Sequence, residues 1–390
     1  MSASITPRTD RVAAAREVAN ATVEEIIALT TAITEVPAPT NDEADRAAFV
    51  AEAFRQRGYA DVSIDALSDV VAVLPGRDRS APPLLLAAHI DTVFPRTVPI
   101  AVDRRGDTLH APGVGDNSLS VAAVAHVAPA LEALGMQPAV DVLVTGNVGE
   151  EGLGDLRGMR AVVDAIPNLG AAVAVEGHSL GRITRRAVGS KRLRITATGP
   201  GGHSWGDAGR PSAIHALAKV IARLDEIPLA SDPKTSLNVG LFEGGISVNT
   251  IAPGASAVID MRSTDPESLA KLVNRVEQII KSGSTREVPI AIDVVGDRPA
   301  GEVPQDRGIV PIGVGVLKEL GIEAVVDASS TDANVPIARG IPAMCIGLTS
   351  GGNVHREDEF IRIPPLATGF AQLLLVTLAV TEALGSGELS

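Results

Sequence analysis

The spacing of apolar residues divides the chain into alternating helices and short strands. Residues 10–58 carry Ala, Glu and Ile at helical spacing, interrupted by a turn at Pro37 and Pro39. Short apolar runs then predict strands at 70–74, 83–88, 139–145 and 171–175, with one long helix at 119–134. Such alternation is typical of a mostly parallel sheet with helices on both faces, so we predict an α/β fold.

The pattern changes near residue 187. Strands are predicted at 191–198, 235–243, 255–263 and 289–295, and helices at 212–224 and 266–282. This βαββαβ order predicts a ferredoxin-like α+β domain. The first pattern resumes near Gly308. We therefore predict an α/β domain built from residues 1–186 and 299–390, interrupted by an inserted domain at 187–298.

Composition limits the kinds of partner and site. The chain has 34 Lys or Arg and 47 Asp or Glu, a formal charge of −13, which argues against nucleic-acid binding. The single Cys345 excludes a disulfide framework and a multi-thiolate metal site. No apolar signal region follows Met1, and the apolar tracts at 121–134 and 370–380 are too short to span a bilayer. We expect a cytoplasmic protein that does not bind membranes.

Histidines and acids recur where predicted strands end or helices begin. These positions are His89 and Asp91, Asp116, Glu150 and Glu151, Glu176, and His355. Open α/β sheets bind ligands at the carboxyl ends of their strands. Imidazole and carboxylate ligands without thiolates favour zinc, manganese or cobalt. Asp91 is spaced to hold the second ring nitrogen of His89. If two metals are held about 3.5–4 Å apart, they would need a bridging carboxylate, and Asp116 is placed for this by its turn.

These residues carry a resemblance to a known family. His89-Ile-Asp91-Thr-Val, Gly115-Asp116-Asn117, Gly149-Glu150-Glu151-Gly152, Glu176 and His355 resemble, in order, the motifs of the dinuclear zinc metallopeptidases. That family includes aminoacylase, carboxypeptidase G, tripeptidase T, acetylornithine deacetylase and succinyl-diaminopimelate desuccinylase. The resemblance implies a catalytic α/β domain with an inserted lid or dimerisation domain. It also implies two divalent metals per chain, zinc foremost, with cobalt or manganese as alternatives.

The resemblance further implies roles for individual residues. His89, Asp116 and Glu176 would hold one metal, and Asp116, Glu151 and His355 the other. Asp91 would orient His89, and Glu150 would be the general base. A cis peptide bond is implied between Asp116 and Asn117.

The resemblance extends into the inserted domain. Gly199-Pro-Gly-Gly-His203-Ser resembles a loop whose histidine stabilises the oxyanion in the partner subunit's active site. Asn249 and Arg262 resemble positions that grip a substrate carboxylate, and Gly351 is a further candidate for substrate binding. We therefore predict a homodimer that hydrolyses an amide bond in a di- or tripeptide or an N-acyl amino acid. Peptidase and N-acyl amino acid deacylase or desuccinylase activities both stay open.

Three other interpretations compete with this one. Gly177-His-Ser179-Leu-Gly181 fits a nucleophile elbow, with Asp332 and His355 as triad partners of a serine α/β-hydrolase. Gly152-Leu-Gly154 through Gly158 resembles a dinucleotide loop, but two neighbouring glutamates would repel a pyrophosphate. A non-catalytic binding protein would have lost a ligand or the base, and none of those positions is missing.

Overall fold

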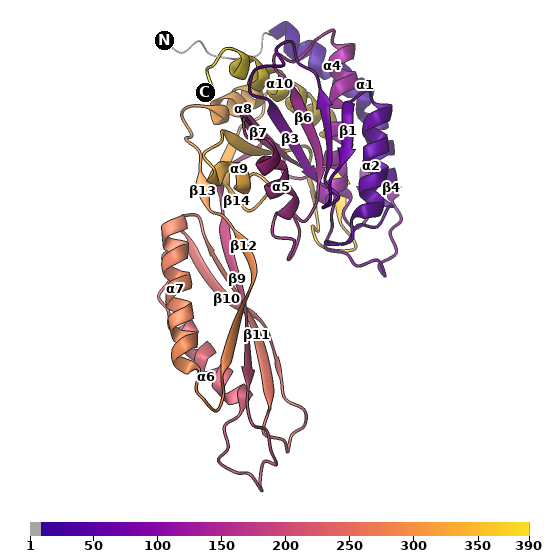
Figure 1. Cartoon of the computed structure of the whole chain (residues 1–390). Coiled ribbons are helices and arrows are strands. Elements are labelled where there is room, and N and C mark those ends of the chain that lie inside the picture. The colour runs from indigo at the N-terminus through magenta and orange to yellow at the C-terminus, as the bar shows by residue number, and fades with distance from the viewer. Residues whose placement is uncertain (1–8, 390) are drawn as a thin grey trace. The chain divides into compact units, whose positions relative to one another are not determined.

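The computed structural model describes residues 9–389. The chain forms two compact units (Figure 1). The α/β unit comprises the residues up to Ala187 and from Glu302 onward, and the inserted unit comprises Val188–Gly301. Each unit has its own hydrophobic core.

A nine-stranded sheet forms the centre of the α/β unit, in the order β1-β2-β6-β3-β7-β15-β8-β13, with β14 beside β8. Neighbours among β6, β3, β7 and β15 run parallel, whereas β2 pairs with β6 and β15 with β8 in antiparallel fashion. Every residue of β3 is buried, as expected for a central strand covered on both faces. The strands are β1 (Ala60–Ile64), β2 (Val70–Leu74), β3 (Leu84–His89), β6 (Val142–Asn147), β7 (Ala171–Glu176), β8 (Arg182–Ala187), β13 (Gly301–Glu302), β14 (Val325–Ser329) and β15 (Ala343–Gly347).

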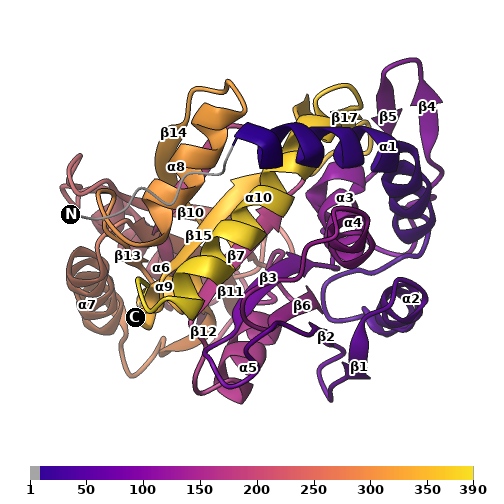
Figure 2. The same cartoon turned by 90° about the horizontal axis from the view of Figure 1, so that it is seen from above.

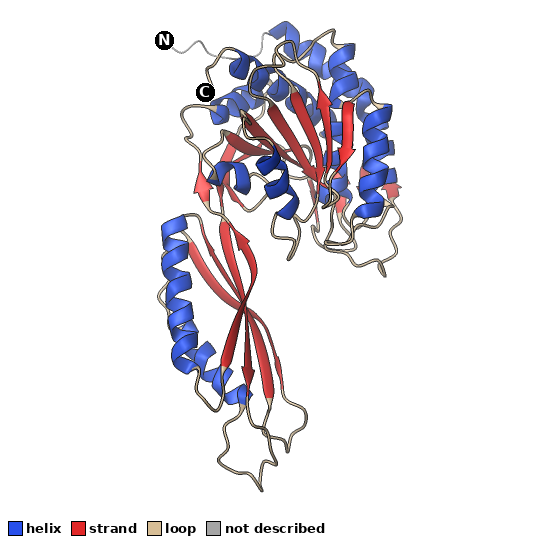
Figure 3. Ribbon diagram, in the orientation of Figure 1, coloured by secondary structure: helices blue, strands red, loops and turns tan. Residues whose placement is uncertain are grey.

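Helices cover this sheet, with α3 and α10 on one face and α5 on the other (Figures 2 and 3). The helices of the α/β unit are α1 (Thr9–Thr34), α2 (Ala44–Gln56), α3 (Leu119–Ala125), α4 (Val127–Ala133), α5 (Arg157–Ala165), α8 (Ile309–Glu319), α9 (Asn334–Ala338) and α10 (Leu366–Gly385). The predicted mostly parallel α/β fold is thereby confirmed.

The single helix predicted at 119–134 is wrong. Helix α3 ends and α4 begins at His126, because Pro129 has no N–H for the carbonyl of Ala125 and its ring crowds that carbonyl. His126 is buried at the break, where Nδ1 lies 2.7 Å from the carbonyl oxygen of Ala122 and Nε2 accepts from Arg57 at 3.1 Å. It is a structural histidine.

Within residues 9–389, helix α10 is the one helix long and apolar enough to cross a membrane. The apolar tract apparent in the sequence, 370–380, is too short to span a bilayer. The helix itself is longer than this tract. However, 83% of its most apolar window is buried inside the protein. Such burial is typical of a central core helix.

A small second sheet beside the central sheet was not predicted. A second sheet joins β16 (Gly351–Gly352), β17 (Phe360–Arg362), β5 (Thr108–His110) and β4 (Asp103–Arg105). These strands have two or three residues each, too few for a periodic pattern. The turn η1 (Val114–Ser118) contains the cis peptide bond between Asp116 and Asn117 that the resemblance implied, and its backbone is not helical at these two residues.

The inserted unit has the order β9 (Gly189–Thr198), α6 (Ala213–Asp225), β10 (Thr235–Gly244), β11 (Gly254–Ser263), α7 (Pro266–Gly283) and β12 (Ile290–Arg298). Its strands form an antiparallel sheet in the order β10-β11-β9-β12. Both helices pack on one face of this sheet. The predicted ferredoxin-like βαββαβ topology is confirmed.

Candidate metal centre

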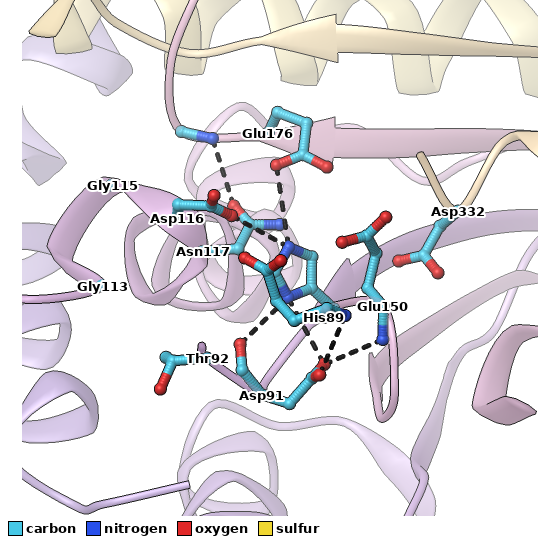
Figure 4. Close-up of polar contacts among 12 residues, drawn as sticks. His89, Asp91, Thr92, Gly113, Gly115, Asp116, Asn117, Glu150, Glu176 and Asp332 are labelled. Atoms are coloured by element: carbon cyan, nitrogen blue, oxygen red, sulfur yellow. Dashed lines mark hydrogen bonds and ion pairs between the residues drawn. The ribbon is translucent and has the colours of Figure 1, made fainter. Parts of the chain in front are cut away.

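His89 stands at the carboxyl end of β3, with its side chain buried. Its Nδ1 lies 3.1 Å from the main-chain oxygen of Asp91 and 3.5 Å from Asp91 Oδ1. Its Nε2 lies 3.1 Å from Asp116 Oδ1 and 3.9 Å from Glu176 Oε2 (Figure 4). A hydrogen on Nδ1, donated to the Asp91 carbonyl, leaves the Nε2 lone pair facing both carboxylates. A metal-bound imidazole needs this arrangement.

The carboxylate of Asp116 faces two histidines with different oxygens. Oδ1 lies 3.1 Å from His89 Nε2, and Oδ2 lies 3.1 Å from His355 Nε2. The same His355 nitrogen lies 3.0 Å from Glu151 Oε1. Ligand atoms of His89, Asp116 and Glu151 all lie within 4.8 Å of one another. Asp116 therefore occupies the position that a bridging carboxylate would need.

The side chains fit divalent metals in spacing and chemistry. Ligands about 2.0–2.2 Å from a tetrahedral zinc lie roughly 3.4 Å from one another, and the contacts described above span 3.0–3.9 Å. Among residues 9–389, His89 Nε2 finds no hydrogen-bond partner of normal geometry although it is buried. A metal would use this lone pair. The nitrogen and oxygen ligands suit zinc, manganese or cobalt.

The cluster shifts the pKa values of its members. Burial alone would lower the pKa of His89, but Asp116, Asp91 and Glu176 outweigh it and raise that pKa well above its usual value. Hydrogen bonds to Asp116 and Glu151 raise the pKa of His355 to about 10. Burial raises the pKa of Glu176 well above its usual range. Because metal ligands must be deprotonated, metal binding at this cluster would release protons.

Asp91 does more than contact His89. Its carboxylate is completely buried and accepts hydrogen bonds from the backbone N–H groups of Glu150 and Glu151, both at 3.0 Å, and from the Thr40 hydroxyl at 2.8 Å. Asp91 thus fixes the turn that carries both glutamates. Figure 4 shows Glu150 beside the His89 ring, with Asp332 next to it.

Two further residues that hold the site were not predicted. The buried amide of Asn117 donates to the carbonyl of Val175 at 2.8 Å and accepts from Gly177 N at 3.1 Å, so it bonds the backbone on both sides of Glu176. Glu359 accepts from the backbone around Asp116. In the sequence, Glu359 closes an acidic run with Glu357 and Asp358, and nothing there separates a buried acid from exposed ones. Its position four residues after His355 was the available signal.

Three predicted residues lie in the inserted unit, and the structure does not bring them into one cluster. His203 and Asn249 lie on adjacent loop segments, where Ser204 N donates to the Asn249 carbonyl at 2.9 Å. Arg262 is on β11 and donates from Nε to Asp260 Oδ2 at 2.7 Å. In the α/β unit, Gly351 pairs with Ile361 in the small sheet.

The serine-hydrolase interpretation is not favoured. A nucleophile elbow requires a helix after the serine, whereas strand β8 begins at Arg182. The imidazole of His355 contacts the carboxylates of Asp116 and Glu151, and the carboxylate of Asp332 accepts a hydrogen bond from Asn147 Nδ2 at 2.7 Å. The dinucleotide interpretation has no support either, because Gly154 lies in a turn packed against the backbone of Gly149.

The fold and the candidate metal-ligating cluster together fit a metal-dependent amidohydrolase. The sequence pattern of Peptidase family M20/M25/M40 matches residues 85–378, and the chain belongs to this family. This confirms the resemblance described above.

One relative in sequence and two solved structures of the same fold are similar to this chain. A Mycobacterium tuberculosis protein that carries the name succinyl-diaminopimelate desuccinylase is 27% identical over 355 residues, which cover 87% of this chain and 93% of that protein. The solved structure of a Staphylococcus aureus tripeptidase has a TM-score of 0.78 at 20% identity, covering 92% of this chain and 99% of that one. A Bacillus subtilis structure described as a dinuclear metal-binding peptidase has a TM-score of 0.69 at 16% identity, covering 93% and 99%.

Proposed function

We propose that this protein uses two divalent metals, zinc foremost and cobalt or manganese as alternatives, to hydrolyse an amide bond in a small substrate with a free carboxylate. The observation that carries the proposal is the carboxylate of Asp116, whose two oxygens each lie 3.1 Å from a different histidine. Asp116 would be shared, His89 and Glu176 would complete one metal position, and Glu151 and His355 the other.

Glu150 is the proposed general base. Two bound metals would polarise the scissile carbonyl and lower the pKa of a water toward ~7. Glu150 accepts the proton of the attacking water and delivers it to the leaving nitrogen, a role typically worth ~10²–10⁴ in rate. Asp91 supports this role because it holds the backbone N–H of Glu150 at 3.0 Å.

The proposed substrates are di- or tripeptides or N-acyl amino acids. Arg262 uses Nε for Asp260, so its Nη groups are the fork that would grip a carboxylate. Asn249 and Gly351 would contribute to substrate binding, and His203 of the partner subunit would stabilise the oxyanion. A deacylase or desuccinylase that acts on N-acyl amino acids is the second candidate, because the Mycobacterium tuberculosis relative carries a desuccinylase name.

We also propose a homodimer formed by the inserted unit. Large apolar side chains are exposed on edge strand β10 and nearby loops, among them Leu241 at 67%, Ile246 at 76% and Trp205 at 87%. Exposed apolar patches mark interaction surfaces, and an unpaired edge strand offers backbone groups to a second copy. A cytoplasmic location stays a prediction.

A substrate screen tests the proposed activity. The zinc- or cobalt-loaded protein is assayed with dipeptides, tripeptides, and N-acetyl and N-succinyl amino acids, each beside its C-terminally amidated counterpart. We expect EDTA to abolish cleavage and free acids to be cleaved faster than amidated controls. Arg262→Ala should reduce that preference. Equal cleavage of acids and amides would contradict the carboxylate requirement, and a metal-loaded protein that cleaves no amide would contradict the function.

A further inference from the structure

The carboxylate of Glu359 accepts four hydrogen bonds in the α/β unit. Oε2 accepts from Gly113 N at 2.8 Å, and Oε1 accepts from Gly115 N at 3.0 Å and Asp116 N at 2.9 Å. The ring nitrogen His178 Nε2 lies 2.9 Å from the same Oε1. Glu359 is completely buried.

Only a carboxylate suits this environment. A buried charge is costly unless hydrogen bonds compensate it, and here both oxygens are used. A glutamine has a single carbonyl oxygen, and its NH2 group would face either Gly113 N or the donors around Asp116. Glu359→Gln therefore keeps the size of the side chain and removes its ability to hold this turn.

The packing leaves the turn no room to find another arrangement. A Cβ atom added to Gly115 would lie 2.2 Å from His178 Nε2, and one added to Gly351 would lie 2.8 Å from His178 Nδ1. Gly113 has a φ of +71°, which a glycine adopts without strain. Glu359 and His178 thus pack directly against the backbone of the Asp116 turn.

The other side of the turn is fixed by Asn117. Its side chain bonds Val175 O and Gly177 N, on either side of Glu176. Glu359 itself lies four residues after His355. The backbone that carries Asp116 is therefore held between the segment of one candidate ligand, Glu176, and the segment of another, His355.

We propose that Glu359 is a positioning residue that fixes the backbone of Asp116 and so sets both metal positions at once. The inference rests on the proposed two-metal site. Loss of the Glu359 carboxylate would misplace the shared ligand and weaken both positions, whereas loss of His355 would weaken one. Replacement of residues that orient a metal ligand typically reduces metal affinity ~10–100-fold.

The test is a Co²⁺ titration of the metal-stripped full chain, followed by visible absorption, which reports ligand geometry. For Glu359→Gln we expect both binding steps to weaken ~10–100-fold, with an altered absorption band. The matched control is Asp141→Asn. Asp141 also accepts from a backbone N–H, that of Gly76 at 2.8 Å, but it precedes β6, at the end of the strand opposite the site. This control should bind Co²⁺ like the unaltered chain.

Each outcome separates the two proposals. Unchanged Co²⁺ affinity and spectrum in a folded Glu359→Gln would overturn the positioning role, while two sites in the unaltered chain would keep the proposed function. An unaltered chain that binds no Co²⁺ would contradict the proposed function itself. If Glu359→Gln does not fold, Glu359→Asp keeps the charge and shortens its reach. It should then show the same weakening at both steps, and a normal titration would overturn the inference.

Discussion

Adjacent residues in the Glu150–Glu151 turn have different surroundings. Glu151 lies 3.0 Å from His355, and its pKa is raised chiefly by burial. The side chain of Glu150 is also buried, and Figure 4 shows it next to Asp332. The Asp91 carboxylate accepts one hydrogen bond from the backbone N–H of each glutamate, and these two bonds fix the orientation of the turn that carries both residues. In the proposed function, Glu151 is a metal ligand and its neighbour Glu150 is the general base.

Substitution of the two glutamates should separate these roles. Glu150→Gln is expected to bind two metals and to lose ~10²–10⁴ or more in kcat. Glu151→Gln is expected to lose affinity for the metal shared with His355. Metal content and turnover are measured on both variants. An active Glu150→Gln, or an inactive one that has also lost its metals, would remove Glu150 from the role of base.

Asp69 predicts a pH dependence of stability. Asp69 lies next to the segment that leads into the Glu150–Glu151 turn, where its Oδ1 accepts a hydrogen bond from Val148 N at 2.8 Å. Burial raises its pKa from 3.8 to about 8. Between these values the folded chain keeps a proton that the unfolded chain has released. The group therefore lowers the free energy of unfolding as pH rises, by ~1.4 kcal/mol per pH unit.

Asp69→Asn should remove this slope. In EDTA, urea denaturation at pH 5, 6 and 7 should show the variant gaining stability over the unaltered chain as pH rises. A difference that stays constant over this range would contradict the assignment.

At the scale of elements, the sequence predicted those helices and strands that coincide with a clear apolar run or periodic pattern. Strands β2 and β7 and the βαββαβ unit follow from their apolar runs. The break at His126 depends on one missing N–H at Pro129, and the short strands β4, β5, β16 and β17 have no period to detect. Most candidate site residues could be predicted because they stand at the ends of predicted strands. Glu359 and Asn117 could not, because they hydrogen-bond the backbone of segments distant in the sequence, and no local pattern indicates such contacts.

The N-terminus of helix α7 tests whether a local sequence signal, an N-cap residue, stabilises the fold. Asp265 precedes Pro266 and accepts from Ser268 N at 2.7 Å, as an N-cap does. Asp265→Ala is expected to cost ~1 kcal/mol of the free energy of unfolding. Ser212, the N-cap residue of α6, makes no side-chain cap hydrogen bond, so Ser212→Ala serves as the control. Equal losses in urea denaturation would contradict the assigned cap.

At the scale of the whole molecule, the net charge of the chain bears on the proposed homodimer. The chain carries −13, and two divalent metals would reduce the site's share of that charge. Electrostatic repulsion between two acidic chains must be overcome by apolar contact. In the proposed homodimer, the exposed apolar side chains of β10 would provide such contact.

Light scattering should therefore give twice the 40.0 kDa mass of one chain. Leu241→Glu should shift the protein toward monomers, because it places a charge on exposed apolar β10. Val325→Glu replaces a similarly exposed apolar residue on β14 of the α/β unit and should leave the mass unchanged. A monomeric unaltered chain with full activity would contradict both the dimer and a role for His203 across subunits.

The most direct test of the central claim is the number of zinc ions per chain, measured by elemental analysis after saturation and removal of free metal. Because Asp116 contacts both histidines, we predict two ions in the unaltered chain and the loss of both in Asp116→Asn. One ion or none in the unaltered chain, or two ions retained by Asp116→Asn, would contradict a shared carboxylate between two metals.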